Sequence, residues 1–291
     1  MWVLLCTLIF LAWAATVHAG TSIVLVGDSP AGATNFLMDA INSCSTLGQQ
    51  YPGTTCAYQQ ISATALSDAA IAANWDSVIQ STNGDIFFGL SFMYGGALAT
   101  VGPKYPSKSF VLYDSPVNPP VANVIGLTFA EDQSGFLAGA AAGVFTTSKK
   151  VGVIGGLAIP PVKRFVNGYL NGILSVCSTC EVYRIYQPSF ADAALGQAAA
   201  QYLISKGADV IFGAGGSMGS AGILYAAQQN TFVIGVDTDE SLSTFAGQTS
   251  GQYLLASAMK YVGVAVKSAF TAIQAGNRGN YNMLLDASLS T

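Results

Sequence analysis

The feature that most constrains the fold of this chain is the regular alternation of short apolar runs with longer amphipathic stretches. Apolar runs of this length are typical of buried strands, and they cover residues 22–27, 85–89, 110–113, 124–129, 151–155, 182–186, 209–212 and 232–236. Apolar residues at helical spacing occupy segments between them, at residues 36–41, 69–79, 136–145, 165–174 and 194–204. Strands that alternate with helices form parallel sheets flanked by helices, so the sequence predicts an α/β fold.

These strands and helices fall into two consecutive sets, which predicts two lobes. One set covers residues 22–129 and the other covers residues 151–239. A chain of 291 residues is long enough to give each lobe its own core. We expect lobe 1 to contain residues 20–129 and a returning helix within about 254–276. Lobe 2 is expected to contain residues 130–253 and about 277–291.

The first 19 residues have the pattern of a secretory signal peptide. Residues 2–15 are almost entirely apolar, and Ala19 precedes the expected cleavage point. A membrane-spanning helix needs about 20 apolar residues, so a retained membrane anchor is the lesser alternative. Cys6 lies inside the apolar run and not after a cleavage point, which argues against a lipid-modified cysteine. We therefore expect a secreted protein, located in the extracellular space or the periplasm.

The low charge of the chain argues against several function classes. Charged residues make up 9% of the sequence and the net charge is −4, so no basic surface is expected to hold nucleic acid. His18 is the sole histidine and leaves with the signal peptide, so the mature chain has no histidine to act as a general base. The sequence therefore indicates no catalytic residues, no cofactor and no metal site.

Four cysteines remain after the signal peptide, in two pairs that are close in sequence. In an oxidising compartment this arrangement predicts the disulfides Cys44–Cys56 and Cys177–Cys180. The second pair also has the spacing of a redox motif. Its neighbour Glu181 disfavours the thiolate that redox chemistry needs, so a structural disulfide is the preferred interpretation.

Polar and aromatic residues follow the apolar runs, where parallel sheets bind ligands. The candidate ligand-binding residues are Asp28, Asn35, Phe36, Ser91, Phe92 and Asp114 in the first lobe, and Phe190, Gly216 and Asp237 in the second. Carboxylates, aromatic rings and backbone amides suit a flat, hydroxylated ligand. Helix capping is the alternative role for any single Asp or Ser, and core packing for any single Phe.

Three sequence blocks, in order along the chain, carry a resemblance to a known family. They are Leu-Thr-Phe-Ala-Glu-Asp-Gln-Ser-Gly-Phe-Leu-Ala-Gly at 127–139, Val-Gly-Val-Ile-Gly-Gly at 151–156 with Ile-Pro and Lys-Arg-Phe shortly after, and the segments 207–216 and 233–239. Together they resemble the basic membrane protein family, which includes purine nucleoside receptors of bacterial ABC transporters. The resemblance implies a type I periplasmic-binding-protein fold, with the ligand between two lobes.

The resemblance also implies roles for individual residues. Phe36 matches the family's aromatic residue after the first strand, Asp237 matches the acidic residue that holds ribose hydroxyls, and Lys260 matches a lysine of the same cleft. An exposed lysine on a helix is the alternative for Lys260. The chain departs from the family at Leu37, where Asn is usual, and at Gly263, where Asp is usual.

The expected function is therefore capture of a small molecule, a purine nucleoside, between the lobes. A membrane permease or a receptor is the expected macromolecular partner. One alternative is a nucleoside hydrolase that uses two carboxylates, with the adjacent Glu131 and Asp132 as the candidate pair. Another alternative is a secreted domain that senses or scavenges the ligand without a transporter.

Overall fold

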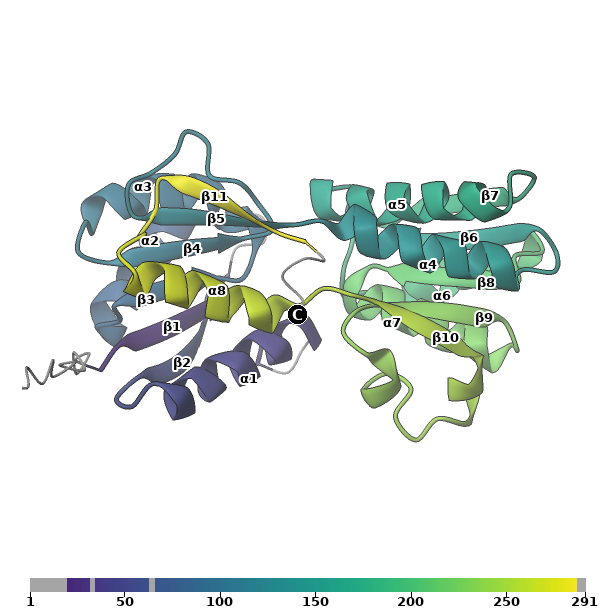
Figure 1. Ribbon diagram of the computed structural model, residues 1–291, viewed down its shortest axis with the longest axis horizontal. Coiled ribbons are helices and arrows are strands. Elements are labelled where there is room, and N and C mark those ends of the chain that lie inside the picture. Colours follow the sequence, from purple (N-terminus) through teal and green to yellow (C-terminus); the bar gives the residue numbers. More distant parts are fainter. Residues whose placement is uncertain (1–19, 32–34, 63–65, 287–291) are drawn as a thin grey trace, which may run out of the picture.

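The computed structural model describes residues 20–31, 35–62 and 66–286, excluding the side chain of Asn35. Two parallel sheets, each with helices on both faces, form two lobes joined by extended crossings (Figure 1). The predicted α/β fold with two helix-flanked sheets is confirmed. The predicted signal peptide lies outside the described residues. Within these residues, no helix has the length and apolar character needed to cross a membrane.

Lobe 1 contains a six-stranded sheet in the order β11-β5-β4-β3-β1-β2. Its strands are β1 (Ser22–Gly27), β2 (Thr55–Gln60), β3 (Ile86–Gly89), β4 (Ser109–Tyr113), β5 (Val124–Phe129) and β11 (Tyr281–Leu285). Its helices are α1 (Asn35–Gln50), α2 (Asp68–Thr82), α3 (Gly95–Lys104) and α8 (Val262–Gln274), with a short 3₁₀ helix η1 (Phe92–Tyr94). Helices α1 and α8 cover one face of the sheet, and α2 and α3 cover the other.

Lobe 2 contains a five-stranded sheet in the order β10-β9-β8-β6-β7. Its strands are β6 (Lys150–Gly155), β7 (Glu181–Tyr186), β8 (Val210–Ala214), β9 (Phe232–Asp237) and β10 (Leu254–Met259). Its helices are α4 (Glu131–Phe145), α5 (Pro160–Val176), α6 (Ala193–Ser205) and α7 (Gly216–Gln228), with 3₁₀ helices η2 (Glu240–Leu242) and η3 (Thr249–Tyr253). Helices α4 and α5 cover one face, and α6 and α7 cover the other.

The C-terminal part of the chain divides between the lobes differently from the sequence-based expectation. Residues 254–259 form the edge strand β10 of lobe 2, where the sequence indicated part of a lobe 1 helix. Strand β11 pairs with β5 in lobe 1, where the sequence indicated lobe 2. The β10 sequence Leu-Leu-Ala-Ser-Ala-Met contains good helix formers and no β-branched residue. Its pairing with β9 therefore overrides its local preference.

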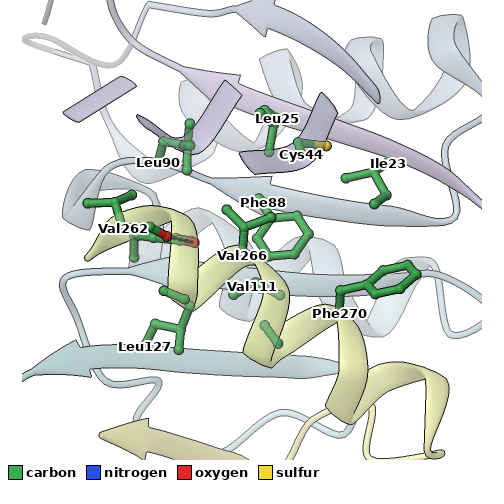
Figure 2. Packing of buried hydrophobic residues seen from close by; sticks show 14 of the residues in the cluster. Ile23, Leu25, Cys44, Phe88, Leu90, Val111, Leu127, Val262, Val266 and Phe270 are labelled. Atoms are coloured by element: carbon green, nitrogen blue, oxygen red, sulfur yellow. Dashed lines mark hydrogen bonds between the residues drawn. The ribbon is translucent and has the colours of Figure 1, made fainter. Parts of the chain in front are cut away.

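The core of lobe 1 fixes the position of helix α8. Val262, Val266 and Phe270 recur at four-residue intervals, so they share one face of the helix. All three side chains are fully buried in the cluster that also contains Leu25 and Phe88 from the sheet (Figure 2). Helix α8 is therefore anchored to lobe 1, although the chain reaches it directly from β10 in lobe 2.

Both predicted disulfides are present, and each lies within one lobe. Cys44–Cys56 joins α1 to β2 with a Cα–Cα distance of 5.9 Å. Cys177–Cys180 joins the end of α5 to the residue before β7 with a Cα–Cα distance of 5.4 Å. Neither pair lines the interlobe cavity described below. The disulfides therefore link neighbouring elements away from the cavity.

Candidate functional site

A cavity of about 840 Å³ lies between the lobes at the carboxyl ends of the strands. Side chains or backbone atoms of nine predicted ligand-binding residues line it: Asp28, Phe36, Ser91, Phe92, Asp114, Phe190, Gly216, Asp237 and Lys260. Asn35, the tenth predicted residue, begins helix α1, and its side chain lies outside the described part of the structure. The cavity occupies the place where ligands bind in parallel sheets, because successive strands end in loops that face it.

The lobe 1 wall is held by hydrogen bonds between its polar residues. Asp28 follows β1, and its carboxylate accepts hydrogen bonds from the hydroxyls of Ser29 and Ser91, each at 3.2 Å. The Ser91 hydroxyl also accepts from the Met93 amide at 3.4 Å, so Ser91 caps η1 as well as lining the cavity. The ring of Phe36 is only partly buried and meets Tyr113 edge to face at 6.2 Å. Core packing therefore orients a ring that also borders the cavity.

The lobe 2 wall is built around Phe190. Its carbonyl accepts hydrogen bonds from the Met218 amide at 2.9 Å and from the Ser217 hydroxyl at 3.1 Å, both at the start of α7. Gly216 has a φ of 60°, and a Cβ there would lie 3.0 Å from the Phe190 carbonyl oxygen. A Cβ on Gly156 would lie 2.3 Å from the Phe190 ring. Both glycines therefore make room for this aromatic wall.

Asp114 and Asp237 occupy matching places in the two lobes. Asp114 follows β4 and Asp237 ends β9, and both line the cavity. Both also have left-handed backbones, with φ values of 63° and 65°. This conformation is costly for most residues but is tolerated by Asp and Asn. Strained residues that gather at one cleft point to a functional role for that cleft.

Lys260 lies between β10 and α8, where the chain crosses from lobe 2 to lobe 1. Its ammonium forms ion pairs with Asp114 at 2.5 Å and with Glu131 at 3.2 Å, and it sits 4.6 Å from the ring centre of Phe129. The side chain is 4% exposed, which contradicts the alternative of an exposed lysine on a helix. Burial opposes the charge, but the carboxylates of Asp114, Glu131 and Asp237 raise the pKa of Lys260 above its ordinary value. The lysine is therefore a buried cation.

Asp237 has a different electrostatic environment. Burial raises the pKa of its carboxyl to about 6; Lys260 acts in the opposite direction, and three nearby carboxylates add to the increase. Among the described residues, no donor makes a hydrogen bond to the Asp237 carboxylate, while its backbone carbonyl accepts from the Lys260 amide at 2.7 Å. The carboxylate is thus held in the cleft with its oxygens available to hydroxyl donors.

Comparison with known proteins identifies the family. The model of the ABC transporter substrate-binding protein PnrA-like family, Bmp, matches residues 21–288. This chain belongs to the Bmp family. The ABC transporter nucleoside-binding protein BmpA of Lactococcus lactis is 34% identical over 193 residues, which are 62% of this chain and 55% of that protein. The CD4+ T-cell-stimulating antigen of Listeria monocytogenes is 29% identical over 223 residues, 72% of this chain and 61% of the antigen. The match thus spans little more than half of these relatives' length.

Solved structures share the fold of this Bmp-family chain. A solute-binding protein of an ABC transporter system from Aeropyrum pernix K1 has a TM-score of 0.78 at 24% identity, covering 91% of this chain and 74% of that one. A transcriptional activator of the comK gene from Bacillus halodurans has a TM-score of 0.73 at 20% identity, covering 92% and 87%. At these identities the similarity establishes the two-lobed architecture.

Two buried carboxylates close to the cavity of this Bmp-family chain, Glu131 and Glu240, were not assigned a ligand-binding role from the sequence. Glu131 is the first residue of α4, its side chain is fully buried, and its carboxylate accepts a hydrogen bond from Arg164 Nε at 2.6 Å. Glu240 is also buried, and it accepts from the Val236 amide and the Ser220 hydroxyl, each at 3.2 Å. Both lie next to other polar residues in the sequence, so no local signal distinguishes these buried carboxylates from exposed ones.

Proposed function

We propose that this chain captures a purine nucleoside in the interlobe cavity. The observation that carries the proposal is the Asp237 carboxylate, which borders the cavity with no hydrogen-bond donor among the described residues. An ionised carboxylate accepts two hydrogen bonds, so it suits the two neighbouring hydroxyls of ribose. Lys260 supplies a donor at the same end of the cavity, as the resemblance to nucleoside receptors implies.

The aromatic residues on the two walls supply the binding surface for the base. Phe36 and Phe92 line the cavity from lobe 1, and Phe190 lines it from lobe 2. A flat base stacked between rings from opposite lobes gains apolar contact on both faces. Asp114, and Asn35 at the start of α1, are proposed to meet the polar edge of the base. Binding would then require both lobes to contact one ligand.

The charge of the cavity favours an uncharged ligand. Asp28, Asp114 and Asp237 are acidic lining residues, and Lys260 is the one basic lining residue among those described. The lysine is already paired with Asp114 and Glu131. A phosphate group would therefore meet an excess of negative charge, so a nucleoside is expected to bind more tightly than its 5′-monophosphate.

Calorimetric titration with inosine, guanosine, their free bases, ribose and the 5′-monophosphates tests this proposal. We expect the nucleosides to bind most tightly, because only they engage the aromatic walls and Asp237 together. Inosine incubated with the protein is expected to remain intact, whereas release of free hypoxanthine would support the hydrolase alternative. A wild-type protein that binds none of the nucleosides would overturn the proposal.

We further propose that the chain is secreted after cleavage behind Ala19 and that the loaded form delivers its ligand to a membrane permease. The description of the family as ABC transporter substrate-binding proteins supports this role. Mass spectrometry of the mature protein tests the cleavage point. Uptake of labelled nucleoside by cells with and without the gene separates delivery from sensing or scavenging, because only delivery makes uptake depend on the protein.

A further inference from the structure

Four buried or half-buried charged residues form a continuous chain between the lobes. Arg164 Nε lies 2.6 Å from Glu131 Oε2, Glu131 Oε1 lies 3.2 Å from Lys260 Nζ, and Lys260 Nζ lies 2.5 Å from Asp114 Oδ1. The signs of the charges alternate along this chain. It begins on α5 in lobe 2, passes through the two crossings that follow β5 and β10, and ends beside β4 in lobe 1.

Glu131 is the most buried member of this chain and does not line the interlobe cavity. Its side chain is fully buried, whereas that of Arg164 is 34% exposed. Glu131 borders a separate cavity of about 380 Å³, which shares Lys260 with the interlobe cavity. A buried carboxylate is costly without cationic partners, so Glu131 depends on Arg164 and Lys260. Glu131 therefore acts on the interlobe cavity through its contact with Lys260 and through its charge near Asp237.

Backbone contacts hold Glu131 and Arg164 in place. Helices α4 and α5 approach so closely that a Cβ on Gly135 would lie 2.4 Å from the Phe165 carbonyl oxygen. A Cβ on Gly168 would lie 2.3 Å from the Asp132 carbonyl oxygen. Glu131 also begins α4, where the helix dipole favours a carboxylate. The position of its carboxylate is thus set by two packed helices and by one helix terminus.

We propose that Glu131 is a positioning residue that, with Asp114, holds the Lys260 ammonium away from Asp237 and so leaves the Asp237 carboxylate free for ligand hydroxyls. This rests on the proposed nucleoside function. Among the described residues no ion pair joins Lys260 to Asp237, although both line the same cavity. Without the charge of Glu131, the ammonium would turn toward Asp237, where it would compete with the ligand's hydroxyl donors.

The first test compares Glu131→Gln with Asp132→Asn, a matched control on the same helical turn. Asp132 is exposed, so its variant removes the same charge from the start of α4 without touching the buried chain. Glu131→Gln should weaken nucleoside binding about tenfold, the size expected for one charge-assisted hydrogen bond, and leave free-base binding unchanged. Asp132→Asn should bind both like the wild type. Equal weakening of nucleoside and base by Glu131→Gln would overturn the proposal.

The second test needs no ligand and therefore separates this proposal from the proposed function. The groups facing Asp237 are Lys260, Asp114, Glu131 and Glu240. Titration of the Asp237 carboxyl carbon by NMR in the unliganded protein should give a lower pKa in Glu131→Gln, because one acidic neighbour is lost and the ammonium lies closer. An unchanged Asp237 pKa in Glu131→Gln would overturn the proposal even if nucleosides bind.

Arg164→Met provides a second variant with the opposite expected sign. It leaves Glu131 charged while removing a cation, so the pKa of Asp237 should rise relative to the wild type. Wild-type protein that ignores nucleosides would contradict the proposed function alone, while the pKa shifts would still decide the role of Glu131. Shifts of the same sign in Glu131→Gln and Arg164→Met would contradict the positioning role.

Discussion

Asp114 and Asp237 are matching residues of the two lobes that the structure uses in different ways. Each lies at the carboxyl end of an inner strand, each has a left-handed backbone, and each lines the interlobe cavity. Asp114 is paired with Lys260, whereas the Asp237 carboxylate accepts no hydrogen bond from the described residues and has a pKa raised to about 6. The ends of equivalent strands thus supply equivalent positions, and the charged partner decides which carboxylate remains available.

The largest effect is expected when the shared cation is removed. Lys260→Met leaves Asp114 and Glu131 without its ammonium, and a broken buried ion pair typically costs about 3–5 kcal/mol of the free energy of unfolding. Urea unfolding measures this loss. Lys267→Met, on the exposed side of α8, is the control and should change stability by less than about 0.5 kcal/mol. Adding Asp114→Asn to Lys260→Met should recover part of the loss, because it removes one of the unpaired carboxylates.

Replacing Asp114 or Asp237 by asparagine, in two separate variants, tests this comparison directly. Both positions need a left-handed backbone, which Asn adopts as readily as Asp, so the variants change charge without adding strain. Asp237→Asn should weaken nucleoside binding by about ten- to a hundredfold, the cost of a lost charge-assisted hydrogen bond, and leave free-base binding unchanged. Asp114→Asn should have a smaller effect on calorimetric affinity. The reverse order would show that Asp114 is the main contact.

The pH dependence of binding should reflect the carboxyl of Asp237. Its pKa is raised to about 6, so the group gains a proton as the pH falls through this value and can no longer accept two hydroxyl donors as a carboxylate. Nucleoside affinity should therefore fall by up to about tenfold per pH unit below pH 6. Calorimetry between about pH 5 and pH 7.5 tests this, with Asp237→Asn as a variant that should lack the decline. Free-base binding should be flat in both proteins.

The smallest effect concerns the stability of the unliganded protein. The folded-state pKa of Asp237, about 6, lies above its ordinary value of 3.8, so ionising the carboxyl is harder in the folded state. The resulting penalty grows as the pH rises from about 4 to about 6 and is constant above that. Asp237→Asn should therefore raise the free energy of unfolding at pH 7 by on the order of 1 kcal/mol, with no difference below pH 4. Urea titrations at both pH values check this.

The limits of sequence-based prediction follow from how each element is stabilised. Strands such as β4 and β8 are buried on both faces and read as continuous apolar runs, so they were predicted. The edge strand β7 was also predicted, because Val182, Tyr183 and Ile185 favour strands, whereas the edge strands β2, with two Gln residues, and β10, with helix-favouring Leu and Ala, were missed. Residues predicted from their positions after the apolar runs gather at one cavity. The roles of Glu131 and Arg164 depend instead on the packing of α4 against α5, which no local sequence pattern encodes.

The close contact between Gly156 and the Phe190 ring affects how the shape of this cavity can be changed, by design or by mutation. Gly156 lies behind the aromatic ring, and a methyl group there would occupy the space that the ring now fills. A single alanine at this position would reshape the lobe 2 wall while leaving Asp237 and Lys260 untouched. Under the proposed function, shape selectivity and hydroxyl recognition would therefore be separable traits, and a new base preference would be accessible without rebuilding the polar half of the cavity.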